Sequence, residues 1–265
     1  MSITGSTRLY AIIGDPVAPL RSPALFNAAF ARQGRDAAFI AFQIADGDLA
    51  AAWPGLRAMG NLDGLVITMP HKEAVIPLLA RLGPTARLTG TVNTIRRDAA
   101  GDFEGDMFDG EGFRDGLERA DHSLPGKRIL QIGCGAAGRA IACALARAGA
   151  AELTLHDATP GRAEALANLL AQHFPTTRAQ PGAPDPRGQD IVVNATPMGL
   201  RADDPLPLDV TKLDAAQLVA DVIPNPEITP LIAAARALGC PTTTGRDMHE
   251  GQARLAAAYL GIGLD

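Results

Sequence analysis

The sequence predicts an α/β protein with two domains, and two observations carry this prediction. A glycine-rich turn near the middle of the chain lies between an apolar, strand-like run and an alanine-rich helical segment. On both sides of it, short apolar runs alternate with helical patterns, an order typical of parallel βαβ units. The 265 residues are enough for one or two domains with buried cores.

The stretch 128–157 has the most informative pattern in the chain. An apolar run at 129–132 is followed by a glycine turn, then by a helical segment that Gly149 ends, and then by a second apolar run at 153–155. In this context G-x-G-x-x-G predicts a dinucleotide site, because its glycines permit a tight turn, close approach of the backbone to the pyrophosphate, and packing of helix on strand. The helix N-terminus offers free N–H groups to the phosphates. The expected cofactor contacts in the turn are Gly133, Gly135, Ala136, Ala137 and Gly138.

Asp157 follows the second of these strands, about 20 positions after Gly138, the spacing at which an acid binds the ribose 2′-hydroxyl of NAD. Its carboxylate would repel the 2′-phosphate of NADP. Arg162 could instead pair with that phosphate, so NADP stays possible beside NAD. An alternative role for Asp157 is to cap the helix that carries 163–170.

The chain before the turn alternates strands with helices. Ser22 is expected to cap a helix whose first residue is Pro23. Pro54 is expected to interrupt or delay a helix over 48–59, and a hairpin is expected around Ala100-Gly101. The other expected elements are strands at 8–13, 38–42, 64–68 and 91–95 and a helix at 73–82.

The alternation continues after the dinucleotide unit. No internal repeat or low-complexity tract interrupts it. The expected elements are strands at 190–193, 218–222 and 242–244, helices at 229–238 and 249–260, and a surface loop at 181–186.

The composition disfavours several functional classes. The net charge of −5 without a basic stripe argues against nucleic acids and anionic membranes as partners. The three cysteines have no metal-site spacing and fit reduced thiols. Neither a signal-peptide pattern nor an apolar run of ~18 residues appears. We therefore expect a cytoplasmic protein, monomeric or homodimeric, without a metal centre.

Several polar residues follow predicted strands, where ligands bind in open α/β sheets. Thr68, Lys72, Asn93 and Asp109 all fall there. Hydride transfer from an alcohol needs a group that takes the hydroxyl proton, and Lys72 is a candidate, with Asp109 to hold its charge or share the proton. His71 is an alternative base, and the plain alternative for Lys72 is a solvated lysine at the start of a helix.

Short motifs follow one another in a fixed order along nearly the whole chain. They are Gly14-Asp15-Pro16 with Ser22-Pro23, Thr68-x-Pro70-x-Lys72, Val92-Asn93-Thr94, Gly105-Asp106-x-x-Asp109-Gly110, Asn194-Ala195-Thr196-Pro197-x-Gly199, Asn225-Pro226 with Thr229-Pro230-Leu231, and Gly245-x-x-Met248-x-x-x-Gln252. In these motifs the chain resembles the shikimate and quinate/shikimate dehydrogenases.

The resemblance implies roles for individual residues and for the two domains. Lys72 and Asp109 would form the catalytic pair. The first domain (1–106, completed by 245–265) would bind substrate, and a Rossmann domain (107–244) would bind NAD or NADP, with the last helix returning to the first domain. The implied substrate contacts are Ser22, Thr68, Asn93 and Gln252, and the further cofactor contacts are Asn194, Thr196 and Gly245.

Departures from the family pattern bear on the substrate. The family loop usually reads Ser-x-Ser-Pro and binds the substrate carboxylate through both hydroxyls, but Leu20 stands at the first serine. Each departure replaces a hydrogen-bonding group by an apolar one, and each group left unpaired costs on the order of 1–3 kcal/mol. The other departures are Val66 for Asn, Met107-Phe108 for Asn-Thr, and Pro224 for Tyr.

The expected activity is reversible hydride transfer between a nicotinamide cofactor and a ring hydroxyl of shikimate, as in aromatic amino acid and chorismate biosynthesis. NADP-using members typically show Asn-Arg-Thr where this chain has Asp157-Ala158-Thr159, which favours NAD, although Arg162 matches a basic position of the NADP members. Two alternatives stay open. One is a paralogue acting on quinate or another less polar cyclic hydroxy acid; the other is a non-catalytic nucleotide-binding sensor, against which the retention of Lys72 and Asp109 argues.

Overall fold

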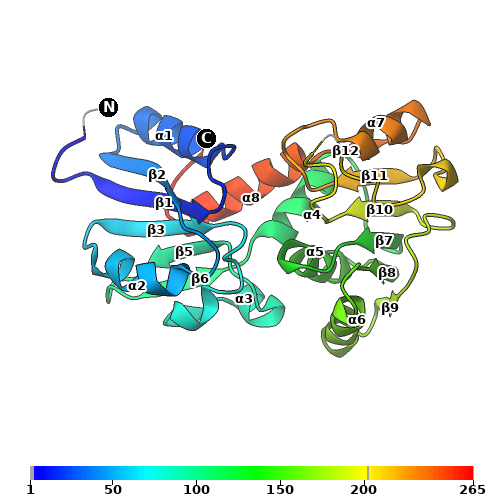
Figure 1. Cartoon of the computed structure of the whole chain (residues 1–265), viewed down its shortest axis with the longest axis horizontal. Coiled ribbons are helices and arrows are strands. Elements are labelled where there is room, and N and C mark those ends of the chain that lie inside the picture. Colours follow the sequence, from blue (N-terminus) through cyan, green and yellow to red (C-terminus); the bar gives the residue numbers. More distant parts are fainter. Residues whose placement is uncertain (1–2, 202, 265) are drawn as a thin grey trace. The chain divides into compact units, whose positions relative to one another are not determined.

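The computed structural model describes residues 3–201 and 203–264, and it consists of two compact units, each with its own six-stranded sheet (Figure 1). Unit 1 contains the chain up to Phe108 together with the residues from Ala253 onward, and unit 2 contains Asp109–Gln252. The predicted α/β class is confirmed. No helix in the described ranges is both long and apolar enough to cross a membrane.

The sheet of unit 1 is mixed, with the strand order β2-β1-β3-β5-β6-β4. Strand β1 pairs in parallel with β2 and β3, whereas β5 is antiparallel to both β3 and β6. The predicted hairpin is confirmed: Asp98 Oδ1 accepts the N–H groups of Ala100 and Asp102 in the turn between β5 and β6. The strands are β1 (Arg8–Gly14), β2 (Ala37–Gln43), β3 (Leu62–Ile67), β4 (Arg81–Leu82), β5 (Thr94–Arg97) and β6 (Phe103–Asp106).

Each face of this sheet has its own apolar cluster. On one face, Ile13, Leu65 and Ile67 pack with Trp53 and Leu56 of α2. On the other, Ile12 and Val66 pack with α1 and with the end of α8, so the C-terminal helix returns to unit 1 as predicted. The helices of the unit are α1 (Ser22–Arg32), α2 (Leu49–Ala58), the 3₁₀ turn η1 (Ile76–Leu78), α3 (Pro84–Thr89) and the last part of α8 (Gly245–Tyr259).

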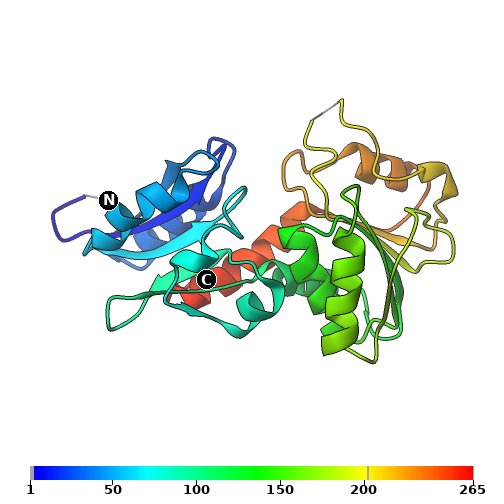
Figure 2. The ribbon, with the colours of Figure 1, turned by 60° about the horizontal axis from the view of Figure 1, so that its bottom comes forward.

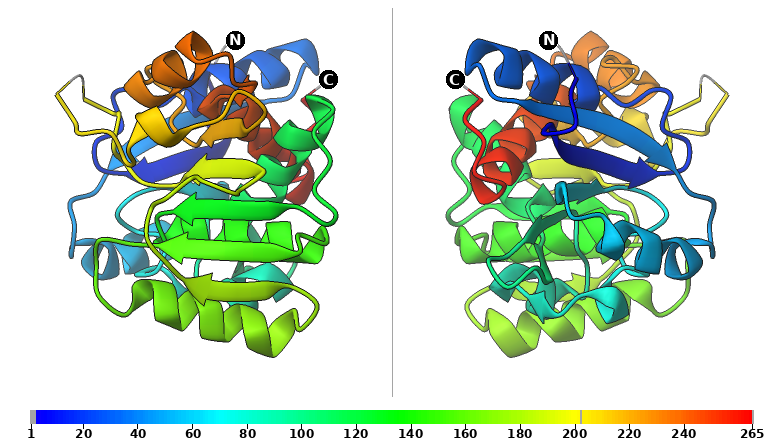
Figure 3. Two further views of the ribbon diagram at one scale, coloured as in Figure 1. Left: turned by 90° about the vertical axis from the view of Figure 1, so that its right-hand side faces the viewer. Right: turned by 90° about the vertical axis from the view of Figure 1, so that its left-hand side faces the viewer.

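The sheet of unit 2 is entirely parallel, with the order β9-β8-β7-β10-β11-β12 (Figure 3, left). Counted from β7, this is the order 3-2-1-4-5-6 of a doubly wound dinucleotide-binding fold. Helix α6 runs beside β8 and β9 (Figure 2). The strands are β7 (Arg128–Ile132), β8 (Glu152–His156), β9 (Arg178–Pro181), β10 (Ile191–Asn194), β11 (Leu218–Asp221) and β12 (Thr242–Thr243); the helices are α4 (Asp109–Arg119), α5 (Ala136–Arg147), α6 (Arg162–His173), η2 (Val210–Lys212), α7 (Pro230–Ala237) and the first part of α8.

Three local predictions in unit 1 are wrong. The helix expected over 73–82 is replaced by turns, η1 and β4, because Pro77 has no N–H to continue a helix. Ser22 is the first helical residue of α1 rather than its cap, which is Arg21. Pro54 lies inside α2 without ending it, since the buried side chains of Trp53 and Leu56 hold that helix on the sheet.

Unit 2 contains elements that the sequence did not predict. Strand β9 forms at the edge of the sheet, partly within the stretch taken as a surface loop. Helix α4 was missed, and α8 begins at Gly245, four residues before the expected start at 249.

Candidate active site

The segment after β3, which carries Lys72, is held by main-chain hydrogen bonds. Thr68 N–H donates to Ile13 O (2.9 Å), and Val92 N–H donates to Lys72 O (2.8 Å). Gly14 lies so close that a Cβ there would approach Thr68 Cγ2 to 2.3 Å. The half-buried Lys72 therefore starts from a fixed backbone at the carboxyl end of the strand.

His71, the alternative base, is fully buried. Its Nε2 lies 2.7 Å from the carbonyl oxygen of Ile44, in the loop after β2. An imidazole anchored in the interior to a main-chain carbonyl links two loops of unit 1. It is less suited than Lys72 to exchange protons with a substrate.

Ser22 and Thr68 present hydroxyl groups without a partner. Ser22 is buried in the first turn of α1, and Thr68 is half-buried directly after β3. Neither hydroxyl forms a hydrogen bond with the residues that the structure describes. Both are therefore available to a ligand, as the predicted substrate role requires.

The side chain of Asn93 holds the last residues of the first segment of unit 1. Its side-chain oxygen accepts hydrogen bonds from the N–H of Phe108 (3.0 Å) and from Thr94 Oγ1 (3.1 Å). The bond to Phe108 fixes the backbone immediately before Asp109, which is the buried first residue of α4. An acid in this position is favoured by the helix dipole.

The apolar departures lie in different surroundings. Val66 is buried in the core on the α1 face, and the half-buried Leu20 packs against the same cluster. Met107 is fully buried, whereas Phe108 is half-buried with its ring 5.2 Å from that of Tyr259. Leu20 thus stands where a second loop hydroxyl was expected, and its side chain contacts the apolar core.

The glycine turn of unit 2 has the geometry that a dinucleotide site requires. Gly133 has φ +101°, and a Cβ there would approach the backbone of Ala195 to 2.6 Å. A Cβ at Gly138 would lie 2.1 Å from Gly133 O, whereas one at Gly135, the N-cap of α5, would meet open space. The first and third glycines are therefore needed for packing, and the second leaves the backbone accessible to a phosphate, with Ala136 and Ala137 beginning the helix.

Gln131 supports this turn and was missed by the sequence reasoning. Its buried Nε2 donates to Gly133 O (2.9 Å) and Gly138 O (2.8 Å). The sequence feature that could have identified this role is a polar residue, Gln131, between the apolar residues of the predicted strand at 129–132.

Asp157 is held against the turn from the end of β8. Its Oδ2 accepts the N–H of Cys134 (2.7 Å) and its Oδ1 accepts the N–H of Thr159 (2.8 Å). It does not cap α6, whose N-cap is Gly161. The exposed Arg162 lies 4.0 Å from its Oδ1.

Asn194 and Thr196 are engaged with their own loop. Asn194 Oδ1 accepts from Thr196 Oγ1 (2.6 Å), and its amide donates to Asp221 (3.2 Å), whose pKa is raised by burial. Because β7, β8, β10 and β11 end side by side, this loop lies at the same edge as the glycine turn. Gly245 opens α8 so close to the loop after β11 that a Cβ would lie 2.2 Å from the Ile223 carbonyl carbon.

Gln252 lies on α8 where that helix approaches α4 closely. A Cβ at Gly112 would lie 2.4 Å from Gln252 N, and one at Gly251 would lie 2.5 Å from Gly112 O. Small residues therefore set the position of the half-buried Gln252. Within the ranges 3–201 and 203–264, no group of three or more His, Cys, Asp or Glu side chains could hold a metal ion.

Comparisons with known proteins identify relatives of this chain. Residues 12–95 match the model of the shikimate dehydrogenase substrate binding domain. A shikimate dehydrogenase (NADP(+)) of Moorella thermoacetica is 39% identical over 94% of this chain and 86% of its own. A shikimate 5-dehydrogenase from Listeria monocytogenes, solved with shikimate and NAD, is 30% identical with a TM-score of 0.89 over 100% of this chain and 96% of its own. A ligand-free 5-ketofructose reductase of Gluconobacter is 35% identical, with a TM-score of 0.85 over 98% of this chain and 95% of its own.

Proposed function

The chain belongs to the shikimate dehydrogenase family, and on this premise we propose that it catalyses reversible hydride transfer between a nicotinamide cofactor and a ring hydroxyl of shikimate. The oxidised product would be 3-dehydroshikimate. The observation that carries this proposal is the pairing, in one chain, of an open glycine turn at α5 with a lysine fixed at the carboxyl end of β3.

In this proposal the first domain (1–106, completed by 245–265) binds the substrate, and the Rossmann domain (107–244) binds the cofactor. When bound, the nicotinamide ring accepts or supplies the hydride. The amine of Lys72 takes the hydroxyl proton during oxidation and returns it during reduction. Asp109 supports the charged lysine. The hydroxyls of Ser22 and Thr68, with Asn93 and Gln252, orient the substrate.

NAD is the cofactor we propose as preferred. The two hydrogen bonds from Cys134 and Thr159 hold the carboxylate of Asp157 at the end of β8, where its charge would repel a 2′-phosphate. The relative from Moorella is named for NADP(+), and the exposed Arg162 is the residue that could pair with the phosphate. The three buried, unpaired cysteines suit a reducing compartment, so we place the protein in the cytoplasm.

A second candidate is a related enzyme whose substrate lacks the carboxylate of shikimate. Leu20 supports it, because an apolar side chain packed on the core cannot supply the second hydroxyl that would bind a carboxylate. The likeness to a 5-ketofructose reductase supports such a substrate, because 5-ketofructose carries no carboxylate.

Initial rates on shikimate, quinate and 5-ketofructose, each with NAD or NADP and in the direction that each substrate allows, test both candidates. The main proposal expects kcat/KM of ~10⁴ M⁻¹s⁻¹ or more on shikimate. Rates at least a hundredfold higher on 5-ketofructose than on shikimate would establish the second candidate instead. Wild-type protein that binds cofactor and turns over none of them would contradict both and favour a sensor.

A further inference from the structure

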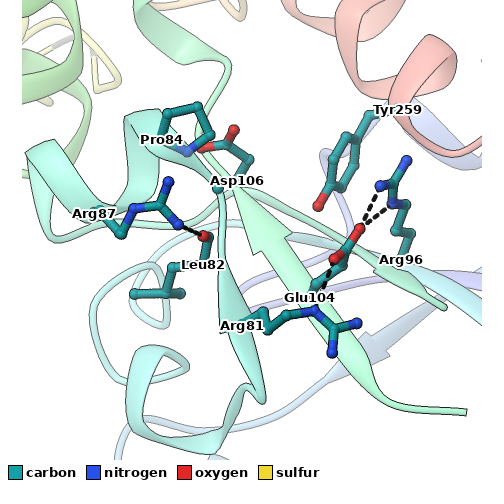
Figure 4. A pocket seen from close by; sticks show the side chains of 9 residues that line it. Arg81, Leu82, Pro84, Arg87, Arg96, Glu104, Asp106 and Tyr259 are labelled. Atoms are coloured by element: carbon teal, nitrogen blue, oxygen red, sulfur yellow. Dashed lines mark hydrogen bonds and ion pairs between the residues drawn. The ribbon is translucent and has the colours of Figure 1, made fainter. Parts of the chain in front are cut away.

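Unit 1 contains a polar pocket, formed by β4, the start of α3, β5, β6 and the last turn of α8. Its volume is about 490 Å³. None of the residues assigned above to substrate, cofactor or proton transfer lines it. The charged and polar side chains around it are Arg81, Arg87, Arg96, Glu104, Asp106 and Tyr259 (Figure 4).

Positive charge exceeds negative charge in this lining, with three arginines and two carboxylates. Glu104 is paired with both Arg96 and Arg81, and these bonds outweigh burial and hold its pKa below the usual range. Arg87 differs, because its guanidinium donates to the carbonyl of Leu82 and has no carboxylate partner among the described residues. The pocket thus offers one cation that no acidic side chain neutralises.

Tyr259 contributes a hydroxyl directed into the space (Figure 4). That hydroxyl forms no hydrogen bond in the described part of the chain. The centroid of the Tyr259 ring lies 5.2 Å from that of Phe108 and 4.4 Å from Arg96 Cζ, and these two contacts fix the ring. Burial, reinforced by Glu104, raises the pKa of Tyr259 to about 12, so its hydroxyl remains a donor at neutral pH.

Asp106 contributes a fixed acceptor. Its Oδ1 accepts the N–H groups of Ala86 (2.7 Å) and Met107 (2.9 Å), which sets the orientation of the carboxylate. Its Oδ2 lies against Gly83, where a Cβ would come within 2.1 Å. Glycine at position 83 therefore gives this oxygen room at the pocket.

We infer that this pocket binds a small hydroxylated anion, a carboxylate or a phosphate ester whose hydroxyl groups complete the recognition. Arg87 and Tyr259 donate to the anionic group, and the ligand's hydroxyls donate to Asp106 and Glu104. This inference does not depend on the proposed activity, because it concerns binding in unit 1 alone.

Titration of the ¹⁵N-labelled full chain with gluconate, inorganic phosphate and uncharged glucose tests the inference. The amides of Gly83 and Arg87 report on the pocket. Arg87→Ala removes the unneutralised cation, and Arg32→Ala is the matched control, because Arg32 is also exposed and bonds a single main-chain carbonyl, that of Leu264. Lys72→Ala identifies any signal that arises from the candidate active site.

We expect saturable shifts with gluconate and none with glucose. Affinity should fall tenfold or more in Arg87→Ala and stay unchanged in Arg32→Ala and Lys72→Ala. Saturation by phosphate but not gluconate, with the same loss in Arg87→Ala, would support the site and assign its ligand to the phosphate esters. Equal affinity in Arg87→Ala and wild type, or no saturable shift with either anion, would overturn the inference.

Discussion

We propose that the carboxylate of Asp157 determines the choice between NAD and NADP. Two main-chain N–H groups hold it beside the glycine turn, and Arg162 Nη1 lies 4.0 Å from its Oδ1. Its charge therefore acts at a fixed position, whereas the guanidinium of Arg162 is exposed and has room to move.

Removing that charge should shift preference toward NADP. We expect Asp157→Asn to raise the ratio of kcat/KM for NADP to that for NAD by about tenfold, because one repulsive charge interaction of roughly 1.4 kcal/mol disappears. Arg162→Ala should lower the same ratio. Initial rates with both cofactors at a fixed substrate concentration measure the NADP-to-NAD ratio. An unchanged ratio in both variants would contradict the proposal that Asp157 and Arg162 set the cofactor preference.

The thiols give a prediction about pH. Burial, together with the nearby charge of Asp157, raises the pKa of Cys134 from 9.0 to about 12, and burial raises that of Cys143 to about 12. A raised pKa keeps the thiol protonated, so the thiolate fraction at pH 8 falls by about a thousandfold relative to the unfolded chain.

Iodoacetamide labelling followed by peptide mass spectrometry should therefore find Cys134 and Cys143 unreactive in the native protein at pH 8. Both should react readily in denaturant. Because unfolded thiols ionise near pH 9 and folded ones do not, stability should also decline as pH rises from 9 toward 12. Fast native labelling of Cys134 would indicate a reactive thiol and contradict the account.

At the scale of elements, α4 depends on glycine for close packing rather than for flexibility. Gly110 lies against Ala140 of α5, and Gly112 lies against the backbone of Gln252 in α8. A Cβ at either position would lie within 2.4 Å of main-chain atoms.

Gly112→Ala should therefore destabilise the protein by roughly 1–3 kcal/mol through overpacking, despite the gain in helix propensity. Gly55→Ala is the matched control: it is also inside a helix, but a Cβ there would meet nothing within 4 Å. It should be neutral or stabilise by about 0.5–1 kcal/mol. Thermal and urea unfolding of both variants measure the difference, and equal effects would show that the α4–α8 approach is not tightly packed.

The glycines of α4 explain why that helix could not be predicted from the sequence. Strands such as β1, β3 and β7 are mainly apolar and were predicted, as was the turn at 133–138. Helix α4 was missed because its glycines lower helix propensity and only contacts with α5 and α8 compensate. The helix expected over 73–82 was wrong because Pro77 has no N–H to continue it.

Only part of the candidate site could be predicted from the sequence. Lys72 and Thr68 could be placed from the sequence because both follow the end of β3. The placement of Asn93 after a strand was wrong, because β5 begins only at Thr94. The supporting residues Gln131, Asp106 and Asp221 could not, since their partners are main-chain groups and side chains brought near only by the fold.

At the scale of the whole molecule, the proposed activity uses residues of both units. Unit 1 carries Lys72 and unit 2 carries the glycine turn, so the proposed activity requires both. Binding of cofactor by itself requires only unit 2. Loss of catalysis and loss of cofactor binding should therefore be separable by substitution in one unit.

Measuring kcat/KM on shikimate and the NAD dissociation constant for Lys72→Ala tests directly whether Lys72 transfers the proton. Lys212→Ala is the control, since Lys212 forms a surface ion pair with Asp209 in unit 2. We predict that Lys72→Ala loses about 10²–10⁴-fold in kcat/KM while its NAD affinity and that of Lys212→Ala match wild type. Undiminished turnover in Lys72→Ala would contradict the assignment of Lys72 as the proton-transfer group.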